Sequence, residues 1–241
     1  MVTETQLLSY AEHSPPIAEF IERKIEVNLT DNSQVLSNLF SQQLEWKSEF
    51  LNYIKEKAGD ICIVGNASNL IKNEHGLKID KHSVVIRFNN YCSESGVQKS
   101  IGSSISVWVK SPSYITPKYI YGEGVSWSII SGPDILYTMS NWSDVIQHLN
   151  AGSKVLTPPL YLWNKLVKVL EAPPSAGILM IAWILEVLDD HNDLNIAGFQ
   201  LPCDSLEQYH HDSPRHNWIK ERNLLEVWRK KGLNFIDRLD Q

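Results

Sequence analysis

The stretch from Ile61 to Asn90 constrains the fold of this chain more than any other part of the sequence. It opens with a short apolar run, Ile61 to Val64, and a second, β-branched run, Val84 to Ile86, follows further on. Runs of this length and composition are typical of strands buried in a parallel sheet. Polar residues follow both runs: Gly65, Asn66, Ser68 and Asn69 after the first, and Arg87, Asn89 and Asn90 after the second. Because open α/β sheets bind ligands at the carboxyl ends of their strands, we expect a ligand site there.

The asparagines in this cluster suit binding better than proton transfer. An amide lacks the charge of a catalytic acid, but it supplies two donors and an acceptor in one plane. That arrangement matches the hydroxyls of a ribose or the edge of a base. Asn and Gly are also ordinary turn residues, so residue type alone leaves both interpretations open.

Length and charge limit the class of protein. The 241 residues, 43% of them hydrophobic, suffice for one sizeable core and are too few for two full-sized domains. The formal net charge of -6 argues against nonspecific nucleic-acid binding, which needs a basic face. Cys62, Cys92 and Cys203 are odd in number and lack metal spacing, so we expect free thiols in a reducing compartment.

We expect no targeting signal in this chain. Its first residues have neither the basic region nor the apolar core of a signal peptide, and no stretch reaches the roughly 18 apolar residues of a membrane span. We therefore expect a soluble cytoplasmic protein.

The remaining pattern predicts a single α/β domain. Residues 1–58 read as an N-terminal helical extension packed on the core, with a long amphipathic helix after Asp31, and residues 59–241 read as the ligand-binding domain. The amphipathic helices leave peripheral membrane association open. The further strands that we expect are 105–109, 125–130, 154–156 and 233–236.

A second informative stretch runs from Ala172 to Phe199. Two prolines, Ser175, Ala176 and Gly177 precede a helix that is apolar on nearly every side. Such a helix start presents free backbone N–H groups and a positive dipole, which together form an anion site. A well-capped core helix without a ligand is the alternative.

Three histidines in seven residues mark a third stretch, which runs from Tyr209 to Glu221. His210, His211 and His216 could bind a metal, but no thiol lies at suitable spacing. They could also be surface residues of a polar loop. Acid–base chemistry is the preferred interpretation, because imidazole titrates near neutrality. Asp189, Asp190 and Asp193 follow the apolar helix and are interpreted as a solvated turn without metal.

The first stretch resembles the large motif of the sialyltransferases of glycosyltransferase family 29. That motif reads approximately VVGNSGNL, YGxEID, HDxVxRMN and a Gly before DVGS. Here the matching segments are VGNASNL, HGLKID, HSVVIRFNN and Gly96 before SIGS. In the family this segment holds the nucleotide of CMP-sialic acid. The donor-binding candidates that the resemblance implies here are Gly65, Asn66, Ser68, Asn69, Arg87 and Asn89.

The other two stretches resemble the family's later motifs. PSAGILMIAWIL is similar to the small motif PSTGxLxLxxAL, which implies that Ser175, Ala176 and Gly177 approach the donor's phosphate and carboxylate; Ala176 replaces the usual Thr. His216 and Glu221 match the last motif, a His and a Glu separated by four residues, in which the His is the general base. His210 or His211 would assist the leaving phosphate, since YHHD is similar to the family's HYYE.

The animal members of the family carry an N-terminal anchor and a disulfide between their two main motifs. We expect this chain to differ from them in both features. In this chain Cys62 lies one position away from the family's cysteine, and the second motif has none. With the expected lack of an anchor, this implies a soluble, bacterial-type member of the family.

The resemblance implies a Rossmann-like α/β/α sandwich of the sialyltransferase (GT-A-like) type. It implies inverting transfer of a nonulosonic acid from a CMP donor to a hydroxyl of a glycan, glycolipid or polysaccharide, with no metal or other cofactor. Two alternatives stay open: a transferase of CMP-Kdo or another CMP-2-keto sugar, and a catalytically silent nucleotide- or glycan-binding protein.

Overall fold

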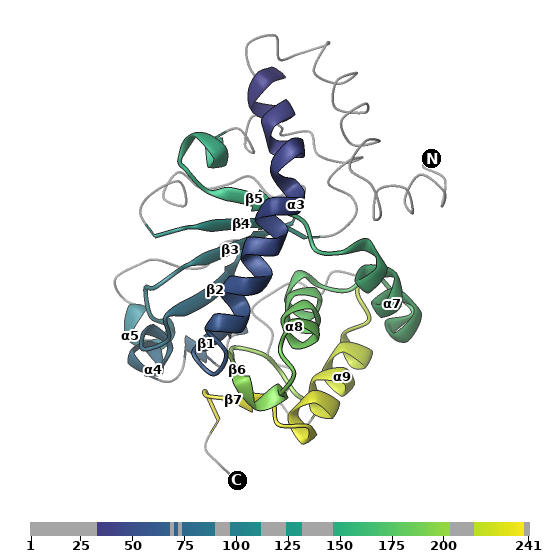
Figure 1. The fold of residues 1–241 in the computed structure, drawn as a ribbon. Helices are drawn as coiled ribbons and strands as arrows, with labels where there is room; N and C mark the ends of the chain where they lie inside the picture. The colour runs from purple at the N-terminus through teal and green to yellow at the C-terminus, as the bar shows by residue number, and fades with distance from the viewer. Residues whose placement is uncertain are drawn as a thin grey trace.

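The computed structural model of the chain describes residues 33–67, 70–71, 74–89, 97–111, 124–131, 147–202 and 215–238. Seven strands form one sheet in which every pair of neighbours is parallel (Figure 1). The strands are β1 (Ile61–Val64), β2 (Val84–Phe88), β3 (Val107–Lys110), β4 (Trp127–Ile130), β5 (Lys154–Leu156), β6 (Leu194–Ala197) and β7 (Asn234–Phe235).

The order of the strands identifies the edge of the sheet where a ligand would bind. The order is β5-β4-β3-β2-β1-β6-β7, so the chain proceeds outward from β1 and then returns to β1's other side with β6. Ile61 pairs with Val84 on one side and with Leu194 on the other. Such a reversal creates a crevice at the carboxyl ends of the strands. The segments that follow β1, β2 and β6 are therefore brought together there.

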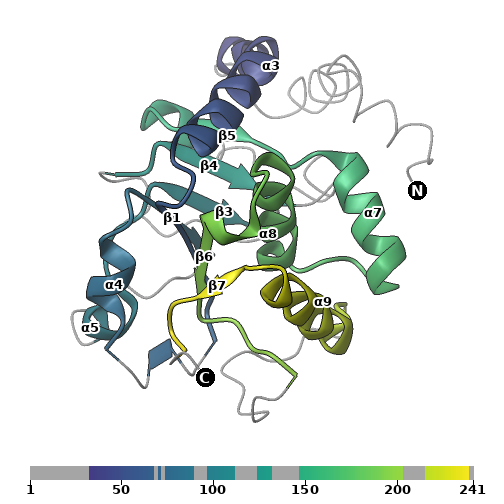
Figure 2. The same ribbon diagram turned by 60° about the horizontal axis from the view of Figure 1, so that its bottom comes forward.

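Helices cover both faces of the sheet (Figure 2). They are α3 (Ser33–Glu56), α4 (Gly76–Asp80), α5 (Gln98–Ile101), α7 (Leu160–Leu170), α8 (Ala176–Val187), the short 3-10 helix η4 (His191–Asp193) and α9 (Trp218–Lys230). Ile61 and Ile63 share one core with α3, α7 and α8, whereas Cys62 and Val64 share a second core with α4 and α5. This alternation along β1 is the strand period of two, and it produces an α/β/α sandwich.

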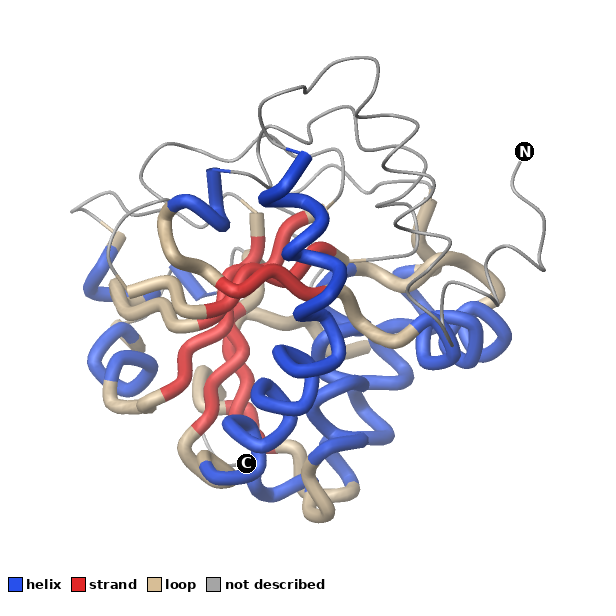
Figure 3. The backbone as a smooth tube through the Cα atoms, turned by 45° about the horizontal axis from the view of Figure 1, so that its top comes forward, coloured by secondary structure: helices blue, strands red, loops and turns tan. Residues whose placement is uncertain are grey.

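Helix α8 forms the centre of the larger core because it is buried on nearly every side. Its eight buried residues run without interruption from Ile178 to Leu185. Helix α3 lies across the strands (Figure 3). Phe50 and Ile54 on α3 are fully buried and Phe50 packs against Trp183 of α8, with ring centroids 5.1 Å apart. The C-terminal part of this helix thus belongs to the core of the sandwich.

The α/β architecture expected from the sequence is confirmed, and β1 and β5 have the expected bounds. Strands β3 and β4 each begin two residues later than expected, at Val107 and Trp127. The N-terminal helix expected before Asp31 lies outside the described residues, as do Cys92 and Cys203, and the domain boundary at residue 58 stays a prediction. Cys62 is a buried free thiol, and burial raises its pKa to about 12.

Two further expectations concern membranes and metals. Within the described ranges, no helix combines the length and apolar composition that a bilayer crossing needs. Nor do the described residues contain a group of three or more His, Cys, Asp or Glu that could hold a metal ion. In the acidic turn after α8, Asp190 caps η4 by accepting a hydrogen bond from Asn192 N at 2.9 Å.

Candidate active site

Two glycines bring the ends of β1 and β6 into direct backbone contact. Gly65 N donates to Ala197 O at 2.8 Å, and Ala67 N donates to Gly198 O at 3.1 Å. A Cβ atom on Gly65 would lie 2.4 Å from Gly198 O, and one on Gly198 would lie 2.6 Å from Gly65 O. Gly65, one of the predicted donor-binding residues, is therefore required for the approach of the two strands whether or not a ligand is bound.

Asn66 and Asn89 lie at the neighbouring ends of β1 and β2. Asn66 Nδ2 donates to Phe88 O at 3.3 Å, which links the two strand ends. Asn89 has a positive φ of 41°, a conformation that Asn tolerates better than most residues. Its Oδ1 accepts from Ser111 N at 2.8 Å, so part of its amide braces the end of β3. Both asparagines are thus at the predicted edge, and Asn66 keeps its amide oxygen free of any described partner.

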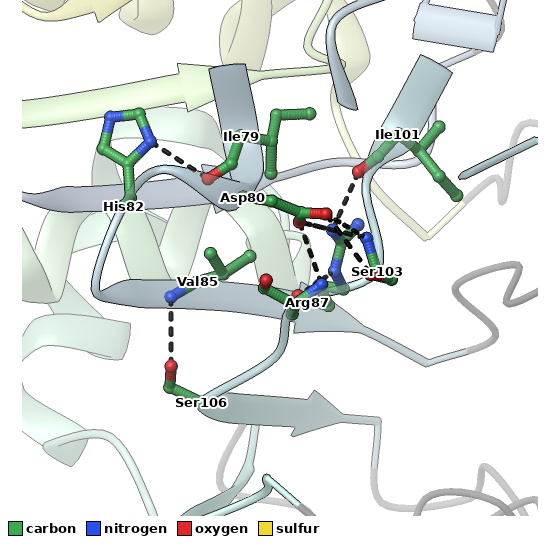
Figure 4. Close-up of polar contacts among 9 residues, drawn as sticks. Ile79, Asp80, His82, Val85, Arg87, Ile101, Ser103 and Ser106 are labelled. Atoms are coloured by element: carbon green, nitrogen blue, oxygen red, sulfur yellow. Dashed lines mark hydrogen bonds and ion pairs between the residues drawn. The ribbon is translucent and has the colours of Figure 1, made fainter. Parts of the chain in front are cut away.

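Arg87 departs from the expectation of a donor contact. It is the fourth residue of β2 and its side chain, 1% exposed, points toward α4 and α5 (Figure 4). Nε donates to Ser104 O and Nη2 to Ile101 O, both at 2.7 Å, and Asp80 Oδ1 lies 3.8 Å from Nη2. Asp80 also accepts hydrogen bonds from the backbone N–H groups of Ser103 and Ser104. Arg87 therefore holds the loop between α5 and β3 from within the protein.

Replacing Arg87 with lysine tests this structural role. An ammonium group cannot reproduce the planar fork that reaches both carbonyl oxygens, so we expect the free energy of unfolding to fall by about 2 kcal/mol. The affinity for a nucleotide should stay within about threefold, because Arg87 does not face the ligand edge. Urea unfolding and calorimetry measure the two quantities. Intact stability with a large loss of affinity would restore the donor contact that the sequence suggested.

Helix α8 begins at the same end of the sheet, with Ser175 as its N-cap. Ser175 Oγ accepts from Ile178 N at 3.3 Å, which is the usual capping bond. Ser175 N donates to Glu221 Oε1 at 2.7 Å, and Ser175 Oγ donates to Glu221 Oε2 at 2.8 Å. Both hydrogens of Ser175 are thus bonded to Glu221. The N–H groups of Ala176 and Gly177 have no partner among the described residues, so they are the donors that an anion would find.

His216 is held against the segment just before α8. Its Nδ1 lies 2.9 Å from Pro173 O, and a carbonyl oxygen only accepts hydrogen bonds, so Nδ1 carries the proton. In the neutral ring the lone pair is then on Nε2, the atom that could take a proton from a substrate. The Trp218 ring packs edge-on against the imidazole, with centroids 5.1 Å apart. Burial lowers the pKa of His216 below its ordinary 6.5, which favours this neutral form at pH 7.

Glu221 is a buried carboxyl group in the first turn of α9. The residue is 3% exposed, and burial raises its pKa to about 7 although the two bonds from Ser175 act in the opposite direction. Together, His216 and Glu221 attach the start of α9 to Pro173 and Ser175. Hydrogen bonds thus link the general-base candidate and Glu221 to the segment where α8 begins.

The pH dependence of stability follows from the raised pKa of Glu221. Between the ordinary 4.5 and about 7, the folded state binds a proton that the unfolded state has lost, so folding becomes less favourable as pH rises through this window. Glu221→Gln keeps both bonding positions without the charge. We expect the variant to be more stable than the wild type above pH 7, by no more than about 3 kcal/mol, and the difference to shrink toward pH 4.5. Thermal unfolding of both proteins from pH 4.5 to 8 measures this difference in stability. The same pH dependence in both proteins would contradict the raised pKa of Glu221.

Four predicted site residues lie outside the described part of the chain: Ser68, Asn69, His210 and His211. The sequence interpretation did not identify the bond between Glu221 and Ser175. The spacing of Glu221 and Leu225, four residues apart on the same helical face, indicated only that Glu221 is buried, as Leu225 is. Phe199 was also overlooked: it packs against Phe88, and a Cβ on Gly177 would lie 2.8 Å from its ring.

The fold and this site define a class of protein: a doubly wound α/β protein in which a hydrogen-bonded imidazole lies beside the start of a buried helix, whose first N–H groups have no partner among the described residues. The sequence profile described as glycosyltransferase family 29 (sialyltransferase) matches residues 5–151. The chain belongs to this family and is a sialyltransferase-like glycosyltransferase. The matched range includes Asn66 and Asn89 but ends before α8, so the placement of Ser175, His216 and Glu221 rests on the structure.

Solved structures agree with the fold. The crystal structure of a mammalian sialyltransferase superposes with a TM-score of 0.56 at 19% identity, covering 72% of this chain and 67% of that chain. A mammalian sialyltransferase in complex with Gal-beta-1-3GalNAc-ortho-nitrophenol gives a TM-score of 0.55 at 20% identity, with the same coverage of both chains. A search among curated proteins returned no match. At these identities the structural likeness establishes the fold and leaves substrates to experiment.

Proposed function

We propose that this protein transfers a nonulosonic acid, with sialic acid as the first candidate, from a CMP donor to a hydroxyl group of a glycan acceptor. The acceptor oxygen would attack the anomeric carbon from the face opposite CMP, the bond from that carbon to the phosphate oxygen would break, and the configuration would invert. His216 Nε2 would take the hydroxyl proton, and CMP would leave with its phosphate on the N–H groups of Ala176 and Gly177. These fixed donors act where negative charge develops.

The observation that supports this function most strongly is the hydrogen bond from His216 Nδ1 to Pro173 O at 2.9 Å. It fixes the tautomer that a general base needs and attaches the imidazole to the residues that precede the anion-binding helix. Asn66 and Asn89, at the ends of adjacent strands, supply amide groups for the cytidine and ribose. Backbone N–H groups and an imidazole require no metal, so metal independence is part of the proposal.

Titration calorimetry with CMP, UDP and GDP in EDTA tests the donor class. We expect CMP to bind with a Kd at least about tenfold lower than the other two nucleotides, a difference of about 1.4 kcal/mol. The same Kd should be found after EDTA is replaced by Mg²⁺. Preference for UDP or GDP, or binding only with added metal, would overturn the proposal.

Turnover separates an enzyme from a silent nucleotide-binding protein. One comparison structure holds Gal-beta-1-3GalNAc-ortho-nitrophenol, so this compound is a reasonable first acceptor for an assay. CMP-sialic acid and CMP-Kdo should be offered as donors in parallel. Release of CMP that depends on both donor and acceptor identifies a transferase and selects the sugar. The glycan, glycolipid or polysaccharide nature of the natural acceptor, the cytoplasmic location and peripheral membrane association stay predictions.

A further inference from the structure

The carboxyl group of Glu221 is buried, and no positively charged side chain of the described residues pairs with it. Its residue is 3% exposed, and the bonds that it accepts come from Ser175 N at 2.7 Å and Ser175 Oγ at 2.8 Å. A buried carboxylate without a positive partner is costly, and such a group commonly takes up a proton. The bonding pattern of Ser175 determines what that proton would change.

With Glu221 ionised, Ser175 has no hydrogen left for a ligand. Its N–H and its hydroxyl hydrogen both go to the carboxylate, and Oγ accepts from Ile178 N at 3.3 Å. If Glu221 Oε2 is protonated, that oxygen becomes the donor to Ser175 Oγ. A hydroxyl oxygen accepts two hydrogen bonds, so Oγ can accept from both Ile178 N and Glu221 while its own hydrogen turns outward.

We propose that Glu221 is a proton-linked positioning residue of the donor site: its carboxyl group takes one proton from solvent when phosphate binds, and this releases the Ser175 hydroxyl hydrogen to the phosphate. The inference rests on the proposed function, which puts a phosphate group at the start of α8. The proton also removes a negative charge that would otherwise lie beneath an incoming anion. The site therefore binds its donor most tightly with Glu221 neutral.

The charged groups around Glu221 in the described part of the chain do not provide a counterion. On its own helix, Lys220 Nζ pairs with Glu171 Oε2 at the end of α7 at 2.7 Å, and Arg222 Nη2 donates to Gln200 Oε1 at 2.9 Å. On the preceding segment, His216 is bonded to Pro173, and Arg215 is exposed. Burial is the main cause of the raised pKa of Glu221, and no charged group of the described chain contributes to it. Phosphate binding thus acts on a carboxyl group that has no charged partner among the described residues.

Calorimetry with CMP between pH 7 and 8.5, in two buffers of different ionisation enthalpy, tests the linkage. At pH 8 the wild type should take up about one proton per CMP, because the free carboxyl group is then mostly ionised. Its Kd should rise about fivefold from pH 7 to pH 8 as the neutral fraction falls from about one half to about one tenth. The phosphate of CMP, with a second pKa near 6, is largely a dianion throughout this range.

Two variants identify the titrating group. Glu221→Gln donates from its amide to Ser175 Oγ, as the protonated acid would, so CMP should bind with a Kd that is flat from pH 7 to 8.5 and without proton uptake. His216→Asn keeps Glu221 and should retain the uptake, which separates Glu221 from an imidazole that gains a proton beside phosphate. Circular dichroism and thermal unfolding establish whether both variants are folded. The pH series on the wild type tests the proton linkage even if a variant does not fold.

The outcomes separate this inference from the function on which it rests. CMP binding by the wild type without proton uptake, or uptake that survives in Glu221→Gln and disappears in His216→Asn, overturns the role of Glu221 and leaves the transferase proposal intact. Absence of CMP binding at every pH overturns the transferase proposal itself. Proton uptake with cytidine, which has no phosphate, equal to that with CMP would show that the linkage does not involve the start of α8.

Discussion

Replacing His216 with asparagine is expected to lower kcat for sugar transfer by about 10²- to 10⁴-fold, the usual contribution of a positioned general base. The Kd for CMP should change by less than about threefold, because the donor's phosphate is bound mainly by the backbone N–H groups of α8. Asparagine retains an N–H that can donate to Pro173 O, so the segment before α8 keeps its anchor. The loss of rate then reports on the Nε2 lone pair.

The matched control for this experiment is His191, which lies in η4 after the far end of α8. His191→Asn should leave kcat within about twofold, since the side chain does not approach the start of α8. A plot of kcat against pH gives a second readout, which a purely structural role of His216 would not change. The wild type should lose activity as the pH falls below the lowered pKa of His216. Unchanged turnover in His216→Asn would remove His216 from the mechanism.

The strands were predictable because their sequences are short, apolar and β-branched. Ile61–Val64 reads as a buried strand at any position in an α/β protein, and the structure gives it these bounds. Strand β3 begins later than its pattern suggests because Val85 N of β2 donates to the side-chain Oγ of Ser106 and not to a backbone carbonyl of that segment. Side-chain bonds of this kind depend on the neighbouring strand and are not visible in one segment's sequence.

The site was only partly predictable, and Arg87 shows why. A cation at the end of a strand suggests a ligand contact, but the alternation along β2 turns it to the same side as Val85, into the core that α4 and α5 cover. Because Val85 faces this core, the strand period of two predicts that the side chain of Arg87, two residues later, faces it as well. Its partners, the carbonyl oxygens of Ile101 and Ser104, belong to a loop whose path is set by tertiary structure.

The contact between Glu221 and Ser175 was beyond the sequence for a different reason. The two residues are 46 positions apart, and nothing local to either predicts that α9 begins against α8. Each segment resembles a family motif, so the sequence predicted that each belongs to the site. It did not predict that the two segments contact each other. Only the structure shows that Glu221 uses both hydrogens of Ser175, which leaves the N–H groups of Ala176 and Gly177 as donors without a partner among the described residues.

The largest effect on stability is expected from Gly198→Ala. Gly198 has a φ of +71°, and an added Cβ would lie 2.6 Å from Gly65 O and 3.0 Å from Gly65 C, so the backbones of β1 and β6 would have to separate. We expect the free energy of unfolding to fall by about 4 kcal/mol or more. Because Asn66 follows Gly65 directly, the affinity for CMP should also fall in any protein that folds.

Gly152→Ala is the matched control, since Gly152 has a φ of +85° and, apart from its chain neighbours, no described residue has an atom within 4 Å of the position of its added Cβ. It carries the backbone strain of a left-handed residue, about 1–2 kcal/mol, without the contact. Urea unfolding of the two variants, followed by tryptophan fluorescence, therefore separates backbone strain from the close approach of the two strands. Equal destabilisation would mean that the ends of β1 and β6 can move apart freely, and Asn66 would then lack the fixed position that a nucleotide site at this edge requires.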